Sequence, residues 1–343
     1  AEGDAAAAAA AAAPAAYSAD APDVLLKILA RKVGEVAELK EAMAKDSGHP
    51  LHAVMGAAAP AERRRAAFRA LKKSPGSLAV IAEIKRRSPS KGFIGEIKNP
   101  GKLSMLYQEA GASVISVLTD GEGFGGSMED LAAVVAAQAK CKGAFPGPCP
   151  VLRKDFTIDE VQIAEAKAAG AAAVLLIVAA LGKENSERLL RAAERMDIDA
   201  VVECHSKEEV EAALEIGAEI IGVNNRNLRT FEVDLSTCEK LKELIVADGR
   251  DIVTVAESGI KECTDAWRLR DAGYNAILVG EKLVELAEDK TFGSNPYQSS
   301  YNGARGLIKA FVSKGSTKYG RPGMGAFYGR GEGAKESLGE IML

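Results

Sequence analysis

The sequence contains few residues that could build a metal centre or a covalent framework. Its five cysteines are scattered without a CxxC pair, which indicates neither a zinc site nor a set of disulfides and favours a reducing compartment. The three histidines, His49, His52 and His205, do not combine with carboxylates at the spacing of metal ligands on a helix. We therefore expect no metal, assign acid–base chemistry to lysine and glutamate, and interpret His205 as structural.

Neither an excess of one charge nor a long apolar run is present. The formal net charge is -4, with 27% charged and 47% hydrophobic residues, which is the balance of a soluble globular protein. No half of the chain is strongly basic, and this argues against nucleic acid as the main partner. Outside an alanine tract near the start, no uncharged apolar stretch reaches the roughly 18 residues of a membrane span, so we expect no membrane insertion.

Both ends of the chain differ from the rest in composition. Residues 1–21 are rich in alanine and poor in aromatics, which predicts a flexible segment that buries no core. Because the first residue is not methionine, we expect a processed N-terminus, explained by import into a plastid or another organelle or by an engineered start, with a cytoplasmic location as the alternative. Residues 315–343 interleave glycine with basic and aromatic residues. They predict a mobile tail, with docking onto a protein partner as the alternative.

Between these ends, short apolar runs alternate with amphipathic segments from residue 78 onward, at intervals of roughly 25 to 35 residues, as strand–helix units require. Several runs, such as 174–178, are continuously apolar, which is typical of parallel strands covered on both faces. The predicted strands are Leu78–Lys85, Val114–Thr119, Pro150–Phe156, Ala172–Val178, Ala200–His205, Ile220–Asn224, Ile252–Glu257 and Ala276–Gly280.

Helix signals separate these strands. Ser127 and Ser206 begin segments that resemble capping boxes, and glycines 170, 217 and 273 lie where helices should end. Apolar residues at helical spacing also predict an extra amphipathic helix over Asp23–Met43, and a closing helix over Gly303–Lys314.

Eight strand–helix units close most simply as an α/β (βα)8 TIM barrel with its active site at the C-terminal ends of the strands. A doubly wound open sheet is the competing architecture, but it would carry a GxGxxG fingerprint after its first strand, and Ser88–Phe93 does not match. We predict one barrel domain over residues 22–314, with extra N-terminal helices within 22–76.

Charged and polar side chains stand at the ends of several predicted strands. Residues i and i+2 of a strand share a face, so Glu83 and Lys85 project together, as do Lys154 and Phe156, and Asn224 and Arg226. Glu203 ends another strand. Charges are rarely placed on buried strands without a partner or a task, which predicts one polar pocket shared by these strand ends.

The last two units carry a phosphate-site signal. Ser258-Gly259 and Gly280-Glu281 follow the seventh and eighth strands, where barrels commonly bind phosphate through backbone N–H groups and a helix N-terminus. Glycine permits close backbone approach to the anion.

As a set, six segments resemble the indole-3-glycerol phosphate synthase family. In order, they are Ile81–Gly92, Val117–Asp120 with Phe124–Ser127, Leu152–Phe156, Val202–Glu203, Ile221–Leu228 and Ala256–Ile260. The resemblance covers about residues 22–314. The alanine tract, residues 288–301 and the glycine-rich tail fall outside the usual pattern.

The resemblance implies a substrate and a reaction. The anionic substrate would be 1-(o-carboxyphenylamino)-1-deoxyribulose 5-phosphate, which is ring-closed, decarboxylated and dehydrated to indole-3-glycerol phosphate without a cofactor. Lys154 would be the general acid of ring closure, and Glu203 and Lys85 would act in dehydration, although which lysine moves which proton stays open. Glu83 and Asn224 would orient these groups.

The same resemblance implies the binding residues. Ser88 and Arg226 would hold the substrate carboxylate. An apolar wall for the aromatic ring would come from Phe124, Phe156 and Leu278. Phosphate would bind at Ser258, Gly259, Gly280 and Glu281, the last through its backbone N–H because its carboxylate repels phosphate.

Each assignment has an alternative. Glu83 and Lys85 could form a structural ion pair, Phe124 and Phe156 could be ordinary core, and Arg226 could pair with a loop carboxylate. The whole chain could instead be another phosphate-binding barrel of the same pathway, phosphoribosylanthranilate isomerase or the tryptophan synthase α subunit. It could also be a non-catalytic barrel recruited as a structural subunit.

Overall fold

The computed structural model of the chain describes residues 17–18, 21–143, 145–288 and 301–313. Most of the alanine-rich segment and the whole tail from residue 315 lie outside these ranges. The expectations for both ends, and the domain limits drawn from them, stay predictions.

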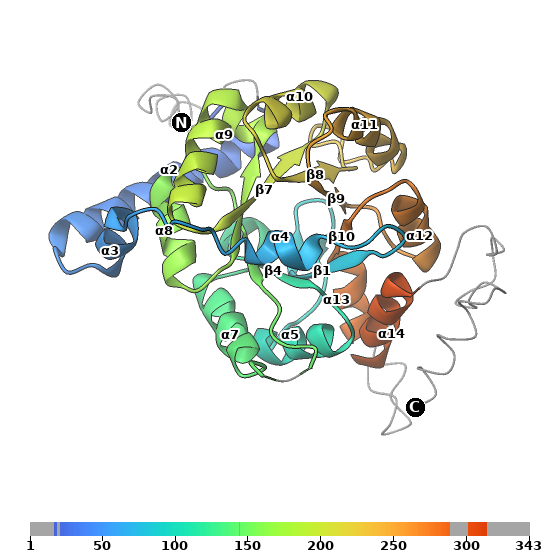
Figure 1. Cartoon of the computed structure of the whole chain (residues 1–343). Coiled ribbons are helices and arrows are strands. Elements are labelled where there is room, and N and C mark those ends of the chain that lie inside the picture. Colours follow the sequence, from blue (N-terminus) through green and yellow to red (C-terminus); the bar gives the residue numbers. More distant parts are fainter. Residues whose placement is uncertain (1–16, 19–20, 144, 289–300, 314–343) are drawn as a thin grey trace.

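Eight parallel strands close into a barrel in the order β1-β10-β9-β8-β7-β6-β5-β4, with β4 pairing back onto β1 (Figure 1). This confirms the predicted (βα)8 barrel. The barrel strands are β1 (Ala79–Ile84), β4 (Val114–Leu118), β5 (Val151–Lys154), β6 (Ala173–Ile177), β7 (Asp199–Cys204), β8 (Ile220–Asn224), β9 (Val253–Glu257) and β10 (Ala276–Val279).

The strands form because their residues are buried on both faces. Every residue of β6 and β7 is buried, between the barrel interior and the surrounding helices. The observed strands are up to three residues shorter than the predicted runs. The strand predicted to reach Phe156 ends at Lys154, where the Asp155 side chain accepts a hydrogen bond from the Phe156 N–H (2.8 Å) and the chain turns.

Helices surround the barrel and follow the predicted signals. The Ser127 and Ser206 side chains accept hydrogen bonds from the N–H groups of Asp130 and Glu209. Glycines 170, 217 and 273 have positive φ just after helices. The helices are α5 (Pro100–Glu109), α6 (Gly121–Phe124), α7 (Met128–Ala139), α8 (Glu160–Ala168), α9 (Val178–Arg195), α10 (Lys207–Glu215), α11 (Ser236–Ala247), α12 (Cys263–Asp271), α13 (Glu281–Glu288) and α14 (Tyr301–Val312). Among the described helices, none is both long and apolar enough to cross a membrane.

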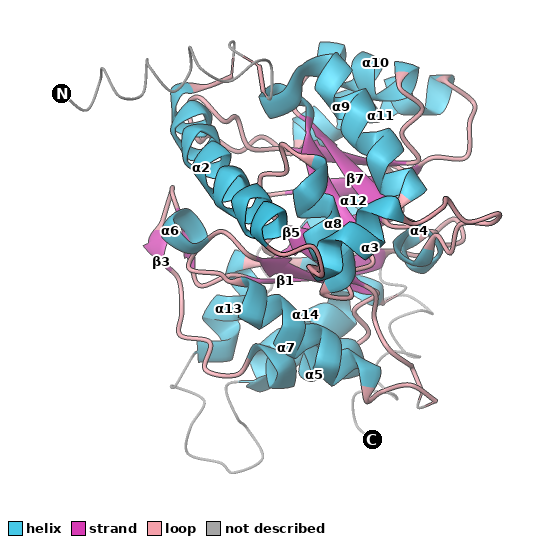
Figure 2. Ribbon diagram, turned by 90° about the vertical axis from the view of Figure 1, so that its left-hand side faces the viewer, coloured by secondary structure: helices cyan, strands magenta, loops and turns pink. Residues whose placement is uncertain are grey.

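Among the described residues, three helices precede the barrel: α2 (Asp23–Lys45), α3 (Pro50–Gly56) and α4 (Ala66–Leu71). The long helix α2 lies on the same side as α6 and β3, whereas α4 lies on the opposite side (Figure 2). The carboxylate of Asp199, at the start of β7, accepts hydrogen bonds from the N–H groups of Ala67 and Phe68 at the beginning of α4 (2.8 and 3.2 Å). Helix α4 thereby packs at the N-terminal ends of the strands, which leaves the C-terminal ends free for the site.

A short hairpin interrupts the first strand–helix connection. It consists of β2 (Arg87–Ser88) and β3 (Gly92–Phe93), paired antiparallel. The sequence analysis did not predict it, because strands of two residues are too short to show periodicity. The hairpin places Ser88 and Lys91 above the C-terminal end of β1.

Candidate active site

A lysine between two glutamates forms the centre of the site. Lys154 Nζ, at the end of β5, lies 3.0 Å from Glu203 Oε2 at the end of β7 and 2.7 Å from Glu257 Oε2 at the end of β9. All three side chains are nearly buried. The C-terminal ends of these strands, called the rim below, thus bring a cation and two carboxylates into direct contact.

Strand register and one glycine make this contact sterically possible. Glu203 of β7 is paired with Gly222 of β8, and Gly222 is paired with Val255 of β9. A Cβ built on Gly222 would lie 2.3 Å from Glu257 Oε1. Since no heavy-atom contact of that length is tolerated, glycine at position 222 gives Glu257 the room to reach Lys154.

Burial and charge divide the three groups into different protonation states. Burial lowers the pKa of Lys154, but the carboxylates of Glu203, Glu257 and Glu83 outweigh it, so the net pKa is raised. Burial raises the pKa of Glu203, yet Lys154 and His205 hold it well below its ordinary value. For Glu257, burial dominates, and the Glu203 charge adds to it, raising the pKa to about 7. The site therefore contains a lysine cation and an ionised Glu203, and Glu257 is the carboxyl of the cluster that holds a proton more readily.

Glu83 and Lys85 project together, as predicted, and form an ion pair with Nζ and Oε1 2.6 Å apart. Glu83 is packed against Gly280 on the neighbouring strand end, where an added Cβ would lie 2.4 Å from Oε1. The charge of Glu83 also raises the pKa of Lys154. The pair belongs to the same electrostatic cluster as the central lysine.

Asn224 and Arg226 extend the cluster from β8. Asn224 Nδ2 donates to Glu203 Oε1 (3.0 Å), and Asn224 Oδ1 accepts from the Arg226 N–H (3.0 Å). The Arg226 guanidinium donates to Ser90 Oγ (3.2 Å) and to the Phe231 carbonyl (3.3 Å). One partner lies on the β2–β3 connection and the other in the loop after β8, and both are neutral; the described ion pairs include none to Arg226.

Two of the three residues predicted for the aromatic wall lie together, and they come from two loops. The rings of Phe124 and Phe156 lie 5.9 Å apart, tilted by 42°. Both side chains are half-buried, whereas Leu278 is buried within β10. Ser88 Oγ, on the facing hairpin, lies 3.4 Å from Ser90 Oγ.

The predicted phosphate residues also lie at the rim. Ser258 and Gly259 follow β9 with φ values of 66° and 82°. Gly280 and Glu281 connect β10 directly to the N-terminus of α13. The Glu281 carboxylate is paired with Lys91 Nζ (3.1 Å), so the side chain is turned to the hairpin while the helix N–H groups remain at the strand ends.

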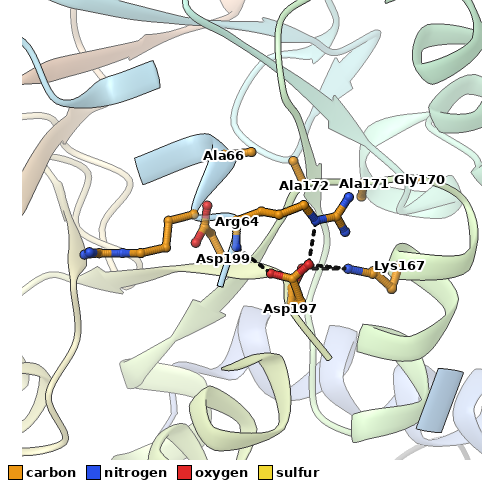
Figure 3. Close-up of a pocket in the computed structure, with 9 residues that line it drawn as sticks. Arg64, Ala66, Lys167, Gly170, Ala171, Ala172, Asp197 and Asp199 are labelled. Atoms are coloured by element: carbon orange, nitrogen blue, oxygen red, sulfur yellow. Dashed lines mark hydrogen bonds and ion pairs between the residues drawn. The ribbon is translucent and has the colours of Figure 1, made fainter. Parts of the chain in front are cut away.

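Two cavities lie at opposite ends of the barrel. One, of about 780 Å³, is bordered by His205, Asn224 and Arg226 and adjoins the Glu203 carboxylate. The other, of about 210 Å³, lies beside α4; within it Arg64 and Lys167 both donate to the Asp197 carboxylate (Figure 3). These groups pair with one another at the N-terminal ends of the strands, away from the rim, so we interpret that cavity as structural.

Two side chains of the cluster were missed as site residues. Glu257 ends an apolar strand just as Glu203 does, and that signal could have found it. His205 stands two residues beyond Glu203, and its Nε2 lies 3.3 Å from Glu203 Oε1. The sequence interpretation of His205 as structural did not foresee this contact.

An eight-stranded parallel barrel that gathers lysine, glutamate and asparagine at its rim defines an acid–base enzyme of the TIM-barrel class. A sequence model of the family described as indole-3-glycerol phosphate synthase matches residues 25–293. The chain belongs to this family, whose members are carboxy-lyases of tryptophan biosynthesis. The resemblance stated from the sequence motifs is confirmed.

Similar curated proteins agree. The indole-3-glycerol phosphate synthase 2 of Streptomyces coelicolor is 45% identical, with 69% of this chain and 86% of that protein covered. The synthase of Chlorobium luteolum is 41% identical over 77% of this chain and 94% of that protein. Among solved structures, the tryptophan synthase α subunit of Legionella pneumophila matches with a TM-score of 0.53 at 14% identity, covering 74% of this chain and 98% of that one. At that identity, the structural match shows the barrel fold alone.

Proposed function

We propose that this chain converts 1-(o-carboxyphenylamino)-1-deoxyribulose 5-phosphate to indole-3-glycerol phosphate, carbon dioxide and water at the rim. The contact of Lys154 with Glu203 and Glu257 carries the proposal, because it supplies a proton donor and carboxylate bases within one nearly buried cluster. Family membership supplies the substrate class.

The substrate is anionic at both ends, and the rim has a cationic or N–H-rich group for each. Arg226 is suited to bind the anthranilate carboxylate, because the hydrogen-bond partners recorded for its guanidinium are neutral. Ser88 would bind the same carboxylate. The phosphate would accept from the backbone at Ser258-Gly259 and at Gly280-Glu281. Phe124, Phe156 and Leu278 would hold the aromatic ring between these ends.

Ring closure is the first chemical step. The anthranilate ring carbon that bears the carboxylate attacks the ribulose ketone, and the carbonyl electron pair moves to oxygen, which takes a proton. Lys154 would give that proton, because it is a charged donor and its contacts with Glu203 and Glu257 fix its direction. Loss of carbon dioxide then returns its bonding electrons to the ring and restores aromaticity.

Dehydration completes the indole. The new hydroxyl leaves with a proton from an acid, and a base removes the proton whose bonding electrons form the double bond. The ionised Glu203 would be the base, while Lys85, paired with Glu83, is the second lysine within the cluster. Asn224 would keep the Glu203 carboxylate in place through its 3.0 Å hydrogen bond.

The test is direct. Purified protein is incubated with the carboxyphenylamino-deoxyribulose phosphate, and indole fluorescence is followed over time. Product formation that saturates with substrate is expected. No product between pH 6 and 9 from a folded sample would contradict the proposal and return the non-catalytic barrel as the better interpretation.

Location and partners extend this proposal beyond the site. Import into a plastid or another organelle rests on the alanine-rich composition of the first residues, with the cytoplasm as the alternative, and fractionation of cells that produce the protein distinguishes them. Docking of a protein partner onto residues 315–343 rests on their mixture of basic and aromatic residues. Comparison of pull-downs with the full chain and with the chain lacking these residues tests it.

A further inference from the structure

His205 lies at the edge of the catalytic cluster with both ring nitrogens against carboxylates. It follows β7 directly, two residues after Glu203, and therefore continues the same side of the strand. Nε2 lies 3.3 Å from Glu203 Oε1, and Nδ1 lies 3.2 Å from Glu209 Oε2. The side chain is 11% exposed and borders the 780 Å³ cavity beside the rim.

This arrangement requires a particular charge state. A neutral imidazole carries one N–H, so one of its nitrogens would present a lone pair to an ionised carboxylate. The Nδ1 atom is in hydrogen-bond contact with Glu209, whereas Nε2 lies 3.3 Å from Glu203 Oε1 in an ion-pair contact without hydrogen-bond geometry. A neutral ring protonated at Nδ1 would turn a lone pair toward the ionised Glu203, while the imidazolium places positive charge against both carboxylates, so the geometry favours the cationic ring.

Helix α10 fixes the orientation of the ring. Glu209, in the first turn of α10, accepts from the backbone N–H of His205 (2.8 Å) through the same oxygen that meets Nδ1. The Glu209 N–H in turn donates to the side chain of Ser206, which caps the helix (3.3 Å). The first turn of α10 thus holds Nδ1, and Nε2 is left to face Glu203.

We propose that the His205 imidazolium, held by Glu209, is a positioning residue that keeps Glu203 ionised and oriented as the base. Glu203 then meets a cation on each side, with Lys154 at Oε2 and His205 at Oε1. Glu257 has no second cation among its described contacts. This difference makes Glu203 the ionised carboxylate and Glu257 the proton-holding one. The expected effect of His205 on kcat rests on the proposed function, whereas the charge state of its ring does not.

The charges around the ring are consistent with this assignment. Burial lowers the pKa of His205, but hydrogen bonds to Glu203 and Glu209 outweigh it and raise the pKa to about 9. Lys154, Glu257 and Asn224 reach the ring only through Glu203. The other charged groups that line the cavity from α10 and the β8 loop are Glu208, Arg226, Arg229, Glu232 and Asp234.

The charge state can be measured without any substrate. The chain has only three histidines, so nitrogen NMR of protein labelled at histidine gives three pairs of ring-nitrogen signals, and the His205 pair is the one absent from His205→Gln. We expect wild-type His205 to carry both protons at pH 7.5 and to titrate near pH 9. Its titration midpoint should fall in Glu209→Gln. A wild-type midpoint below 7 would overturn the proposal, whatever the activity.

Kinetics test the positioning role. In His205→Gln we expect kcat to fall by about 10- to 100-fold with KM within about twofold, because the base is retained but loses the cation at Oε1 and keeps only Asn224 there. The acidic limb of the kcat profile should move to higher pH, since Glu203 loses a cation. Glu211→Gln removes one exposed charge from α10 outside the lining of the cavity and should leave kcat and its pH profile unchanged. If His205→Gln lowers stability alone and keeps the wild-type pH profile, His205 is structural and the proposal fails.

Absence of turnover in the wild type would contradict the proposed function, while the NMR titration would still decide the inference.

Discussion

Lys154 has a stronger claim than Lys85 to the ring-closure proton because its Nζ contacts two carboxylates, while Lys85 has one recorded partner. Replacement by methionine keeps most of the side-chain volume and removes the donor. We predict that Lys154→Met lowers kcat by at least about 1,000-fold, because both general acid and electrostatic stabilisation are lost. The assay is indole fluorescence at saturating substrate.

The fold of Lys154→Met should survive. With the lysine gone, one of Glu203 and Glu257 takes up a proton, which relieves the repulsion between them. Lys98→Met serves as control, since it removes an exposed amine distant from the cluster. Substantial residual turnover in folded Lys154→Met would transfer the acid role of ring closure to Lys85.

The raised pKa of Glu257 makes the free energy of unfolding depend on pH. Its pKa is about 7 in the folded protein against an ordinary value near 4.5, so between these values the folded state holds a proton that the unfolded state releases. This carboxyl therefore lowers the free energy of unfolding as pH rises from about 4.5 to about 7, with no further change above. Glutamine imitates the protonated form. We predict that Glu257→Gln gains about 1 to 3 kcal/mol relative to wild type between pH 5 and pH 7.5.

Urea unfolding at both pH values measures this difference. The exposed Glu243 supplies the control, because Glu243→Gln makes the same chemical change outside the cluster and should give no pH-dependent gain. Parallel curves for wild type and Glu257→Gln would show that Glu257 is already ionised at pH 5.

At the scale of single elements, α2 is attached to the rim by a lysine within its apolar stripe. The buried face of α2 consists of Leu25, Leu29, Lys32, Val36 and Met43. Lys32 Nζ lies 2.8 Å from Asp155 Oδ1 and 3.1 Å from Asp120 Oδ1. Asp155 follows Lys154, and Asp120 caps the helix that carries Phe124. The extra helix is thus tied to the two loops that flank the catalytic lysine.

We predict that Lys32→Met destabilises the protein by about 2 kcal/mol, because Asp120 and Asp155 lose their shared buried cation and keep only Arg31 and Arg153. Urea unfolding followed by tryptophan fluorescence gives the value. Lys27→Met, on the exposed face of the same helix, should cost less than about 0.5 kcal/mol. Equal effects of the two substitutions would mean that the Lys32 ion pairs contribute no more than an exposed lysine does.

The elements were predictable to different degrees for physical reasons. Continuous apolar runs and helix caps are local signals, and they located the barrel strands together with the starts of α7 and α10. The β2–β3 hairpin gives no such signal. Helix α13 was not predicted, because the β10–α13 connection is a single glycine and offers no loop to recognise.

Across the whole molecule, the site was predictable where one strand supplies a pair of charges and unpredictable where strands meet. Glu83 with Lys85 follows from period two within β1. The contact of Lys154 with Glu257 depends on barrel closure, on register and on glycine at 222, which no single segment reveals. Likewise, the role of His205 depends on Glu209, which is supplied by the following helix.

Each candidate site residue lies between positions 83 and 281, within the stretch that the family match covers. Ion pairs recorded for the site are likewise internal to this stretch, including those from the hairpin to α13. We therefore predict that a chain ending at residue 314 keeps kcat and KM within about twofold of the full chain, since no group that binds or transfers a proton is removed. Steady-state assays of both chains check this, with unfolding curves to verify that α14 still packs. A rise in KM of tenfold or more in the shortened, folded chain would show that residues 315–343 contribute to substrate binding. The tail would then be part of the active site and not a docking segment for a partner.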